Sequence, residues 1–328
     1  MAAVDKALSL QPHNATALLI KADLLTDVGD TRGAVAFYSA VTKLAASGSS
    51  VAVEQAEIRR AAAMIEKYAK VFEEHIRSQL DAQGFDQANL PPRFARAIDI
   101  LVGKKRAYQQ EPRHLFFPEL APTQFFDRDL FPFLDTLEAA YDDIKEELNQ
   151  AISEATGFEP YVKSTANRPP SSQRGLADNS AWSAYFLIKE GKLTDGGAKC
   201  PKTLAALRDA PMARIPNHSP MVLFSKLTPG TRIPPHTGMI NTRLVCHLPL
   251  IVPPGCHFRV GNDTRVWEEG RAWIFDDTIE HEAWNQGATD RTILIFDIWR
   301  PDLSDDERRA FAALCVAVDA YAGNSTWD

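Results

Sequence analysis

The sequence predicts an α+β protein in which an α-helical N-terminal region precedes a β-rich domain of the barrel or jelly-roll type. Residues 225–300 form short β-rich runs separated by Pro-Gly, Pro-Pro-Gly, Gly-Asn-Asp and Asn-Gln-Gly turns, which is typical of an all-β barrel or jelly roll. Residues 1–85 instead have the pattern of helices, ending in a long segment with its charges on one face. With 328 residues, the chain is long enough for two domains and a sizeable core.

The composition is that of an ordinary soluble globular protein, with 45% hydrophobic and 24% charged residues. A net charge of −7 leaves no broad basic surface, so we expect no nucleic-acid partner. No run approaches the ~18 to 20 apolar residues of a membrane span, and the N-terminus lacks a basic segment followed by an apolar one, so we expect no span and a cytoplasmic location. The cysteines lack CxxC spacing, which fits a reducing compartment and argues against a zinc cluster; they are Cys200, Cys246, Cys256 and Cys315.

The helical N-terminal region resembles tetratricopeptide repeats, whose period is about 34 residues. Ala7 and Pro12 fit the end of one repeat. The next repeat is matched at Leu18, Ala22, Leu25, Gly29, Ala34 and Tyr38. On this pattern the chain begins inside a repeat, either because a first helix is missing or because the first helix is an atypical cap. The resemblance implies a protein-binding or dimerising surface; the alternative is that the helices only pack against the following domain.

Two histidines, His236 and His281, stand at the ends of β-rich runs. On neighbouring strand ends of a barrel they can converge on one metal ion, because neutral imidazole is a good ligand for iron, zinc or copper. A non-haem Fe(II) oxygenase usually adds a carboxylate two residues after the first histidine, where this chain has Gly238. By residue type alone the site is one ligand short, and a lone histidine on an apolar strand is more often a core or rim residue than a ligand.

The same stretch resembles the aspartyl/asparaginyl β-hydroxylase family of 2-oxoglutarate oxygenases. Matching motifs occur in the family's order: His236-Thr237-Gly238, Arg243-Leu244-Val245-Cys246-His247-Leu248, Phe275-Asp276-Asp277, Glu280-His281-Glu282, Trp284 and Arg291. That family binds iron with two histidines and no carboxylate, so Gly238 becomes part of the match. The resemblance implies a double-stranded β-helix, a jelly roll of cupin type, as the catalytic domain, with Fe(II) as cofactor and 2-oxoglutarate and O2 as cosubstrates.

The resemblance also implies a role for each matched residue. His236 and His281 would bind the metal and form the catalytic centre, and Arg291 would bind the distal carboxylate of 2-oxoglutarate. Arginine suits this task because its planar guanidinium can form two hydrogen bonds to a carboxylate. Ser225 and His247 would assist in cosubstrate binding. By the period of two along a strand, one face carries Arg291, Ile293 and Ile295 and another carries Arg243, Val245 and His247. If these faces form the barrel interior, they line the pocket.

The substrate is less well defined by the resemblance. Trp182 matches a family tryptophan near the active site, and we assign it with Arg243 to substrate binding, against the alternative of a core role for Trp182. Family members that act on Asp or Asn hold the substrate carboxylate with two arginines, and the matching positions here are Ala177 and Val245. Losing both contacts forfeits several kcal/mol, at ~1.5–3 kcal/mol per hydrogen bond to a charged group, unless Arg174 or Arg243 substitutes. The β-carbon of an Asp- or Asn-like residue, a related small molecule and an acyl chain all stay open as substrates.

The expected organisation therefore has three parts. A tetratricopeptide-like helical region covers residues 1–85, a hinge and linking helix cover residues 86–110, and the 2-oxoglutarate oxygenase domain covers residues 111–328. The likeness to the hydroxylase family runs from about residue 114 to residue 303. The expected enzyme is a dioxygenase that hydroxylates an unactivated carbon.

Two interpretations compete with an oxygenase. One is an interaction scaffold with a catalytically silent barrel, which the loss of His236, His281 or Arg291 would favour, and all three are present. The other is a cupin-like metal enzyme or sugar-binding protein without 2-oxoglutarate, against which the pairing of Ser225 with Arg291 argues. The gap at Gly238 also admits a halide, as in 2-oxoglutarate halogenases, although the flanking motifs favour hydroxylation.

Overall fold

The structure is a computed structural model that describes residues 1–328 except 48–52, 87, 155–156, 165–174 and 323–328. The chain divides into two compact units, Met1–Ala107 and Tyr108–Asp328. The limits of the three expected parts stay a prediction. Within the described ranges, none of the helices combines the length and the hydropathy that a membrane crossing requires.

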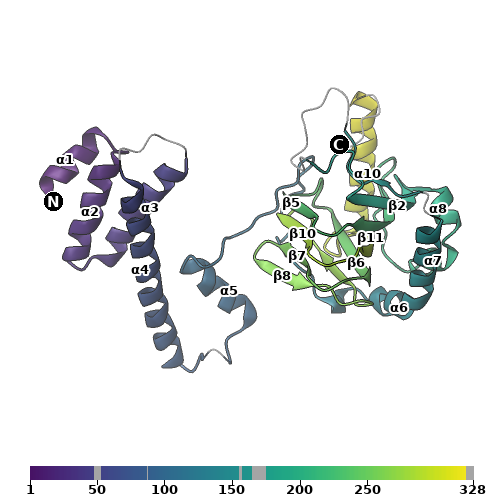
Figure 1. The fold of residues 1–328 in the computed structure, drawn as a ribbon, viewed down its shortest axis with the longest axis horizontal. Coiled ribbons are helices and arrows are strands. Elements are labelled where there is room, and N and C mark those ends of the chain that lie inside the picture. The colour runs from purple at the N-terminus through teal and green to yellow at the C-terminus, as the bar shows by residue number, and fades with distance from the viewer. Residues whose placement is uncertain (48–52, 87, 155–156, 165–174, 323–328) are drawn as a thin grey trace. The chain divides into compact units, whose positions relative to one another are not determined.

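The first unit is helical, as the sequence predicts (Figure 1). Its helices are α1 (Ala2–Leu10), α2 (Ala15–Asp27), α3 (Thr31–Ala46), α4 (Gln55–Asp81) and α5 (Pro92–Leu101). Two of them begin at side-chain caps, because Asn14 accepts a hydrogen bond from an amide of α2 and Asp30 from one of α3. Their shared core buries Leu18, Ala22, Ala34, Tyr38, Val41 and Ala61. The helical character is confirmed, and the assignment to tetratricopeptide repeats stays a prediction.

The second unit contains two antiparallel sheets. The larger has seven strands in the order β1-β2-β4-β11-β6-β9, with β3 beside β2. These strands are β1 (Glu159–Pro160), β2 (Trp182–Lys189), β3 (Lys192–Leu193), β4 (Val222–Leu227), β6 (Arg243–Ile251), β9 (Trp273–Phe275) and β11 (Arg291–Trp299). The smaller sheet has four strands in the order β5 (Arg232–His236), β10 (His281–Asn285), β7 (Cys256–Val260) and β8 (Asp263–Val266). Buried residues of both sheets share one core, so the predicted jelly roll of double-stranded β-helix type is confirmed.

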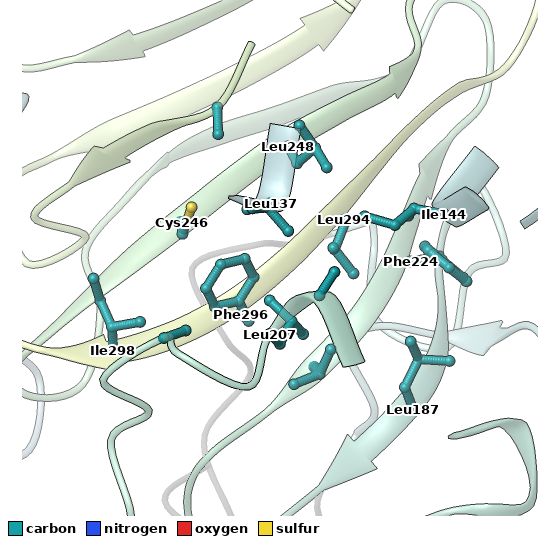
Figure 2. Close-up of a cluster of buried hydrophobic side chains, with 14 of the residues drawn as sticks. Leu137, Ile144, Leu187, Leu207, Phe224, Cys246, Leu248, Leu294, Phe296 and Ile298 are labelled. Atoms are coloured by element: carbon teal, nitrogen blue, oxygen red, sulfur yellow. The ribbon is translucent and has the colours of Figure 1, made fainter. Parts of the chain in front are cut away.

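One face of the large sheet is covered by helices. The even-numbered residues of β6 and β11 are buried in this layer: Leu244, Cys246, Leu248, Leu250, Leu294, Phe296 and Ile298. The chain around this layer forms η1 (Arg128–Leu130), α6 (Phe133–Ala139), α7 (Tyr141–Ser153), α8 (Asp195–Ala198) and α9 (Pro201–Ala206). Figure 2 shows Leu137 of α6 and Ile144 of α7 beside Leu294 in this core. Because side chains alternate along a strand, the odd-numbered residues from 243 to 247 in β6 and from 291 to 297 in β11 lie on the opposite, inner face of the sheet.

The last helix, α10 (Asp305–Ala322), lies beyond the end of β11. Its residues Phe311 and Cys315 pack in a separate small core with Trp299, the final residue of β11. The helices cover one face of the large sheet. The other, inner face of this sheet carries polar residues.

Candidate functional site

A cavity of about 980 Å³ lies against the inner face of the large sheet. All residues that the sequence assigned to a site line it: His236, His281, Ser225, His247, Arg291, Trp182 and Arg243. Ala177 and Val245 line it as well. The third position weighed for substrate binding, Arg174, lies outside the described residues. Strand alternation accounts for much of this set, since β11 contributes every second residue from Arg291 to Asp297.

The two histidines lie directly opposite each other on neighbouring strands. His236 at the end of β5 pairs in register with His281 at the start of β10, and their ring centroids are 4.1 Å apart. Nδ1 of His236 lies 2.8 Å from the carbonyl oxygen of Pro234, and Nδ1 of His281 lies 3.0 Å from that of Ile279. Because a carbonyl oxygen only accepts, each Nδ1 carries the proton, and the lone pair of each ring is on Nε2.

Both histidine rings are neutral at pH 7. Burial lowers the pKa of His236 to about 4. Burial, and then the neighbouring His236, lowers the pKa of His281 well below its usual value. Two unprotonated Nε2 atoms on adjacent rings fit one metal ion. Among the described residues, no group of three or more His, Cys, Asp or Glu side chains is arranged to hold a metal ion.

Glycine suits position 238 because the side chain of Asp277 approaches its backbone closely, and not because the backbone conformation favours glycine. A Cβ at this position would lie 2.2 Å from Oδ2 of Asp277. The carboxyl of Asp277 therefore occupies the space that any side chain two residues after His236 would need. Gly238, where the sequence lacks a carboxylate, thus faces the carboxylate of Asp277 from the loop before His281.

One end of the cavity is built around an isolated positive charge. Arg291 is 2% exposed, and its guanidinium lies 4.9 Å from the ring centroid of Trp267. In the part of the chain that the structure describes, no carboxylate contacts this guanidinium, and its Nε has no hydrogen-bond partner. Burial lowers the pKa of Arg291 to about 10. A buried cation without an anion costs several kcal/mol, on the order of the penalty for a broken buried ion pair, so this end fits an anionic ligand.

Two neighbours complete this anion-binding end. His247 is buried with its Nδ1 unpartnered among the described residues, and burial followed by the Arg291 charge lowers its pKa well below the usual value. Ser225 accepts a hydrogen bond of 3.1 Å from Nε1 of Trp182, and its own hydroxyl proton stays available. Trp182 thus orients Ser225 and also stacks on Tyr161, with ring centroids 4.3 Å apart.

The opposite end holds a second arginine whose charge is balanced. Nη1 of Arg243 lies 2.9 Å from Asp297, and Nη2 lies 3.7 Å from Asp277. Asp297 also accepts from the hydroxyl of Ser219. Burial raises the pKa of Asp277 to about 7, against the lowering effect of Arg243. The guanidinium that the sequence assigned to substrate binding is therefore engaged by carboxylates of its own chain.

Sequence reasoning missed several cavity residues. Asp297 continues the alternating series from Arg291, so the strand pattern contained a signal for it. Asp277 belongs to the matched Phe275-Asp276-Asp277 motif, but the motif alone assigns it no role in the cavity. Tyr161 and Arg113 come from irregular segments, and no periodicity pointed to them. Burial raises the pKa of Tyr161 to about 12, so its hydroxyl stays protonated.

Known proteins similar to this chain share its central segment. Residues 138–301 match the family described as Aspartyl/Asparaginyl beta-hydroxylase. The human aspartyl/asparaginyl beta-hydroxylase is 38% identical over 141 residues, which are 42% of this chain and 18% of that protein. Human aspartate beta-hydroxylase domain-containing protein 2 is 30% identical over 208 residues, or 61% and 54% of the two chains. An ornithine lipid ester-linked acyl 2-hydroxylase from Rhizobium tropici is 30% identical over 195 residues, or 58% and 66%. The chain thus spans under two thirds of the length of these relatives.

Two solved structures show a distant resemblance to the chain. A protein described as a predicted oxalate decarboxylase from Thermotoga maritima has a TM-score of 0.24 and 15% identity, over 36% of this chain and 81% of that one. A cupin domain from Schizosaccharomyces pombe has a TM-score of 0.25 and 8% identity, over 44% and 74%. These values are too low to inform the site.

Proposed function

Because the chain belongs to the aspartyl/asparaginyl β-hydroxylase family, we propose that it is an enzyme that hydroxylates an unactivated carbon, using Fe(II), 2-oxoglutarate and O2. One observation supports this most directly. Two neutral imidazoles with ring centroids 4.1 Å apart share a cavity with a buried arginine that lacks a carboxylate partner among the described residues. The imidazole pair suits a metal ion, and the arginine suits one carboxylate of a dicarboxylate cosubstrate.

His236 and His281 would hold the iron through Nε2. Their low pKa values mean that no proton has to leave the rings when a metal binds near neutral pH. The hydrogen bonds from Nδ1 to Pro234 and Ile279 fix the orientation of both rings before binding. When bound, the iron with its cosubstrates would supply the oxidising power that C–H hydroxylation needs.

Arg291, Ser225 and His247 would bind the distal carboxylate of 2-oxoglutarate. Arg291 would gain the counter-ion that its buried position lacks, and hydrogen bonds to a charged group stabilise by ~1.5–3 kcal/mol each. Ser225 would donate its hydroxyl proton, since its oxygen already accepts from Trp182. The aromatic rings of Phe258, Trp267 and Phe275 line this end of the cavity and exclude water from it.

The substrate is proposed only at the level of a peptide residue, a related small molecule or an acyl chain. The relatives named above act on aspartyl and asparaginyl residues in one case and on an ornithine lipid acyl group in another. Ala177 and Val245 line the cavity with apolar surface. This lining weakens the case for an Asp or Asn carboxylate held at those two positions.

The N-terminal helical unit is proposed to bind a protein partner, as its tetratricopeptide-like sequence implies. Exposed apolar side chains on it, such as Leu10 and Val28, are compatible with such a surface.

Succinate formation tests the enzymatic proposal. The full chain, with added Fe(II), should convert 2-oxoglutarate to succinate only when O2 is present, and His281→Ala should abolish both this turnover and stoichiometric metal binding. The matched control is His257→Ala, because His257 belongs to the same small sheet but stacks on Trp284 with centroids 5.3 Å apart instead of lining the cavity. If neither wild type nor control binds metal or forms succinate, the chain is a scaffold with a silent barrel.

A further inference from the structure

The cationic side chains that line the cavity differ in whether they already form an ion pair with a carboxylate. Lys163 and Lys189 both pair with Glu159, at 2.6 and 2.7 Å, and Arg243 pairs with Asp297. Arg291 lies at the anion-binding end. Arg113 also lines the cavity, is exposed, and has no ion pair within the described residues. Arg113 is thus a cation at the cavity wall that is available to an incoming ligand.

The backbone of Arg113 is held next to the histidine pair. Its amide donates a hydrogen bond of 2.9 Å to the carbonyl oxygen of Gly238, two residues after His236. The amides of His114 and Leu115 both donate to Met239, at 3.0 and 3.2 Å. The segment that carries Arg113 is therefore fixed against the loop that follows the first histidine, although it lies over 120 residues earlier in the chain.

The charge of Arg113 acts on the cavity interior. Burial is the main cause of the low pKa of His236, and the Arg113 charge lowers that pKa further. The same charge opposes the burial that raises the pKa values of Tyr161 and Asp277. Arg113 thus lies close enough to three cavity groups for its field to be felt, while its exposed guanidinium stays accessible from the mouth.

Much of the cavity lining is apolar. Tyr161 and Trp182 form a stacked pair, and Ala177, Val245 and Ile295 add aliphatic surface. Among the described residues, Glu190 is the lining carboxylate without a cation partner, so it would disfavour a second anionic group. A ligand matched to this surface has an apolar portion inside the cavity and one anionic group at its edge.

We propose that Arg113 is a specificity-determining residue that binds a carboxylate or phosphate of the substrate, and that the substrate joins this single anionic group to an apolar chain. The inference rests on the proposed function, since it places the reacting carbon in the cavity of the histidine pair. Recognition would be bidentate, because the guanidinium offers two parallel N–H donors to either anion.

Calorimetric binding of model ligands to the full chain tests this assignment. The probes are decanoylglycine, its uncharged analogue decanoylglycinamide, and decyl phosphate. Wild type should bind at least one anionic probe about tenfold or more tightly than the amide. Arg113→Ala should reduce that ratio to about one, and Arg113→Lys should retain part of it. The matched control is Lys189→Ala, which removes a lining cation already paired with Glu159 and should leave the ratio unchanged.

Three results would overturn the assignment: no binding of any probe, equal binding of anionic and neutral probes by wild type, or an undiminished ratio in Arg113→Ala. The last result would mean that the anion binds elsewhere, for example at Arg291. Which of the two anions binds more tightly identifies the headgroup. The measurements need no added iron, 2-oxoglutarate or O2, so their outcome is separate from that of the succinate experiment.

Discussion

Two buried arginines on the inner face of the large sheet have opposite surroundings. Arg243 lies between Asp297 and Asp277, at 2.9 and 3.7 Å, whereas Arg291 faces Trp267 and His247 with no carboxylate among the described residues. Arg243 is 8% exposed and Arg291 2%, so burial does not separate them. From this difference we infer that Arg243, balanced by its own chain, stabilises the fold, and we propose that Arg291, which is unbalanced, binds a ligand.

Removing the balanced arginine should have the largest effect. Arg243→Met leaves Asp297 buried without its cation, and we expect a loss of ~3–5 kcal/mol in the free energy of unfolding, measured by urea denaturation. The double variant Arg243→Met/Asp297→Leu removes both charges and should recover most of that loss. If the single variant costs under ~1 kcal/mol, the range of a weak surface pair, Arg243 does not hold this face together.

Removing the unbalanced arginine should affect binding rather than stability. Arg291→Met should weaken 2-oxoglutarate binding by about 10- to 150-fold, equivalent to ~1.5–3 kcal/mol, in anaerobic titrations. The free energy of unfolding of Arg291→Met should equal or exceed that of wild type, because the substitution removes an uncompensated buried charge. Arg265→Met is the control, since Arg265 lies over Phe125 at 3.7 Å outside the cavity. Destabilisation of Arg291→Met to the level of Arg243→Met would erase the contrast.

A methyl group at Gly238 should have a smaller effect on stability. It would clash with the carboxyl of Asp277, so that carboxyl must shift from its place beside Gly238. We expect Gly238→Ala to cost ~1–3 kcal/mol in the free energy of unfolding, as for other overpacked sites. The double variant Gly238→Ala/Asp277→Ala removes the obstruction. If it is no more stable than Gly238→Ala, the two residues do not compete for this space.

A predicted effect of similar size is a dependence of stability on pH. Burial raises the pKa of Asp277 from 3.8 to about 7, so the folded protein retains a proton that the unfolded chain releases between these values. The contribution of this group to stability is therefore full below ~pH 4 and is lost as the pH rises to ~7. The difference in free energy of unfolding between wild type and Asp277→Asn should fall by ~1–3 kcal/mol from pH 4.5 to 7.5 in metal-free protein. A constant difference, or one that grows with pH, would contradict the raised pKa.

The regular elements were predictable because their patterns are local. Helical spacing placed the helices of the first unit, and alternation in residues 291–299 placed Arg291, Ile293 and Ile295 on one face. The same alternation extends to Asp297, which could have been predicted as the partner of a cavity arginine. The histidine pair was a candidate from its position at the ends of β-rich runs, and the resemblance to the hydroxylase family then implied its role as a two-ligand iron site.

The rest depends on contacts between distant segments. The approach of Asp277 to Gly238 arises from how two loops meet, and nothing in either segment alone indicates it. Arg113 reaches the cavity wall only because its segment is hydrogen-bonded to residues 238 and 239. Likewise, the sequence could not distinguish Arg243 from Arg291, because the carboxylates that balance Arg243 come from β11 and from the loop before β10.

Side chains alternate between the two faces of β11, so the packing of the helix layer and the lining of the cavity both depend on the register of this one strand. Leu294, Phe296 and Ile298 pack against the helix layer, while the alternate positions line the cavity and include Arg291 and Asp297. A shift of this strand by one residue would place a guanidinium in the hydrophobic core and a leucine at the anion-binding end of the cavity. Selection should therefore act against insertions and deletions within β11. It should act much less strongly against substitutions that keep the order of large and charged residues.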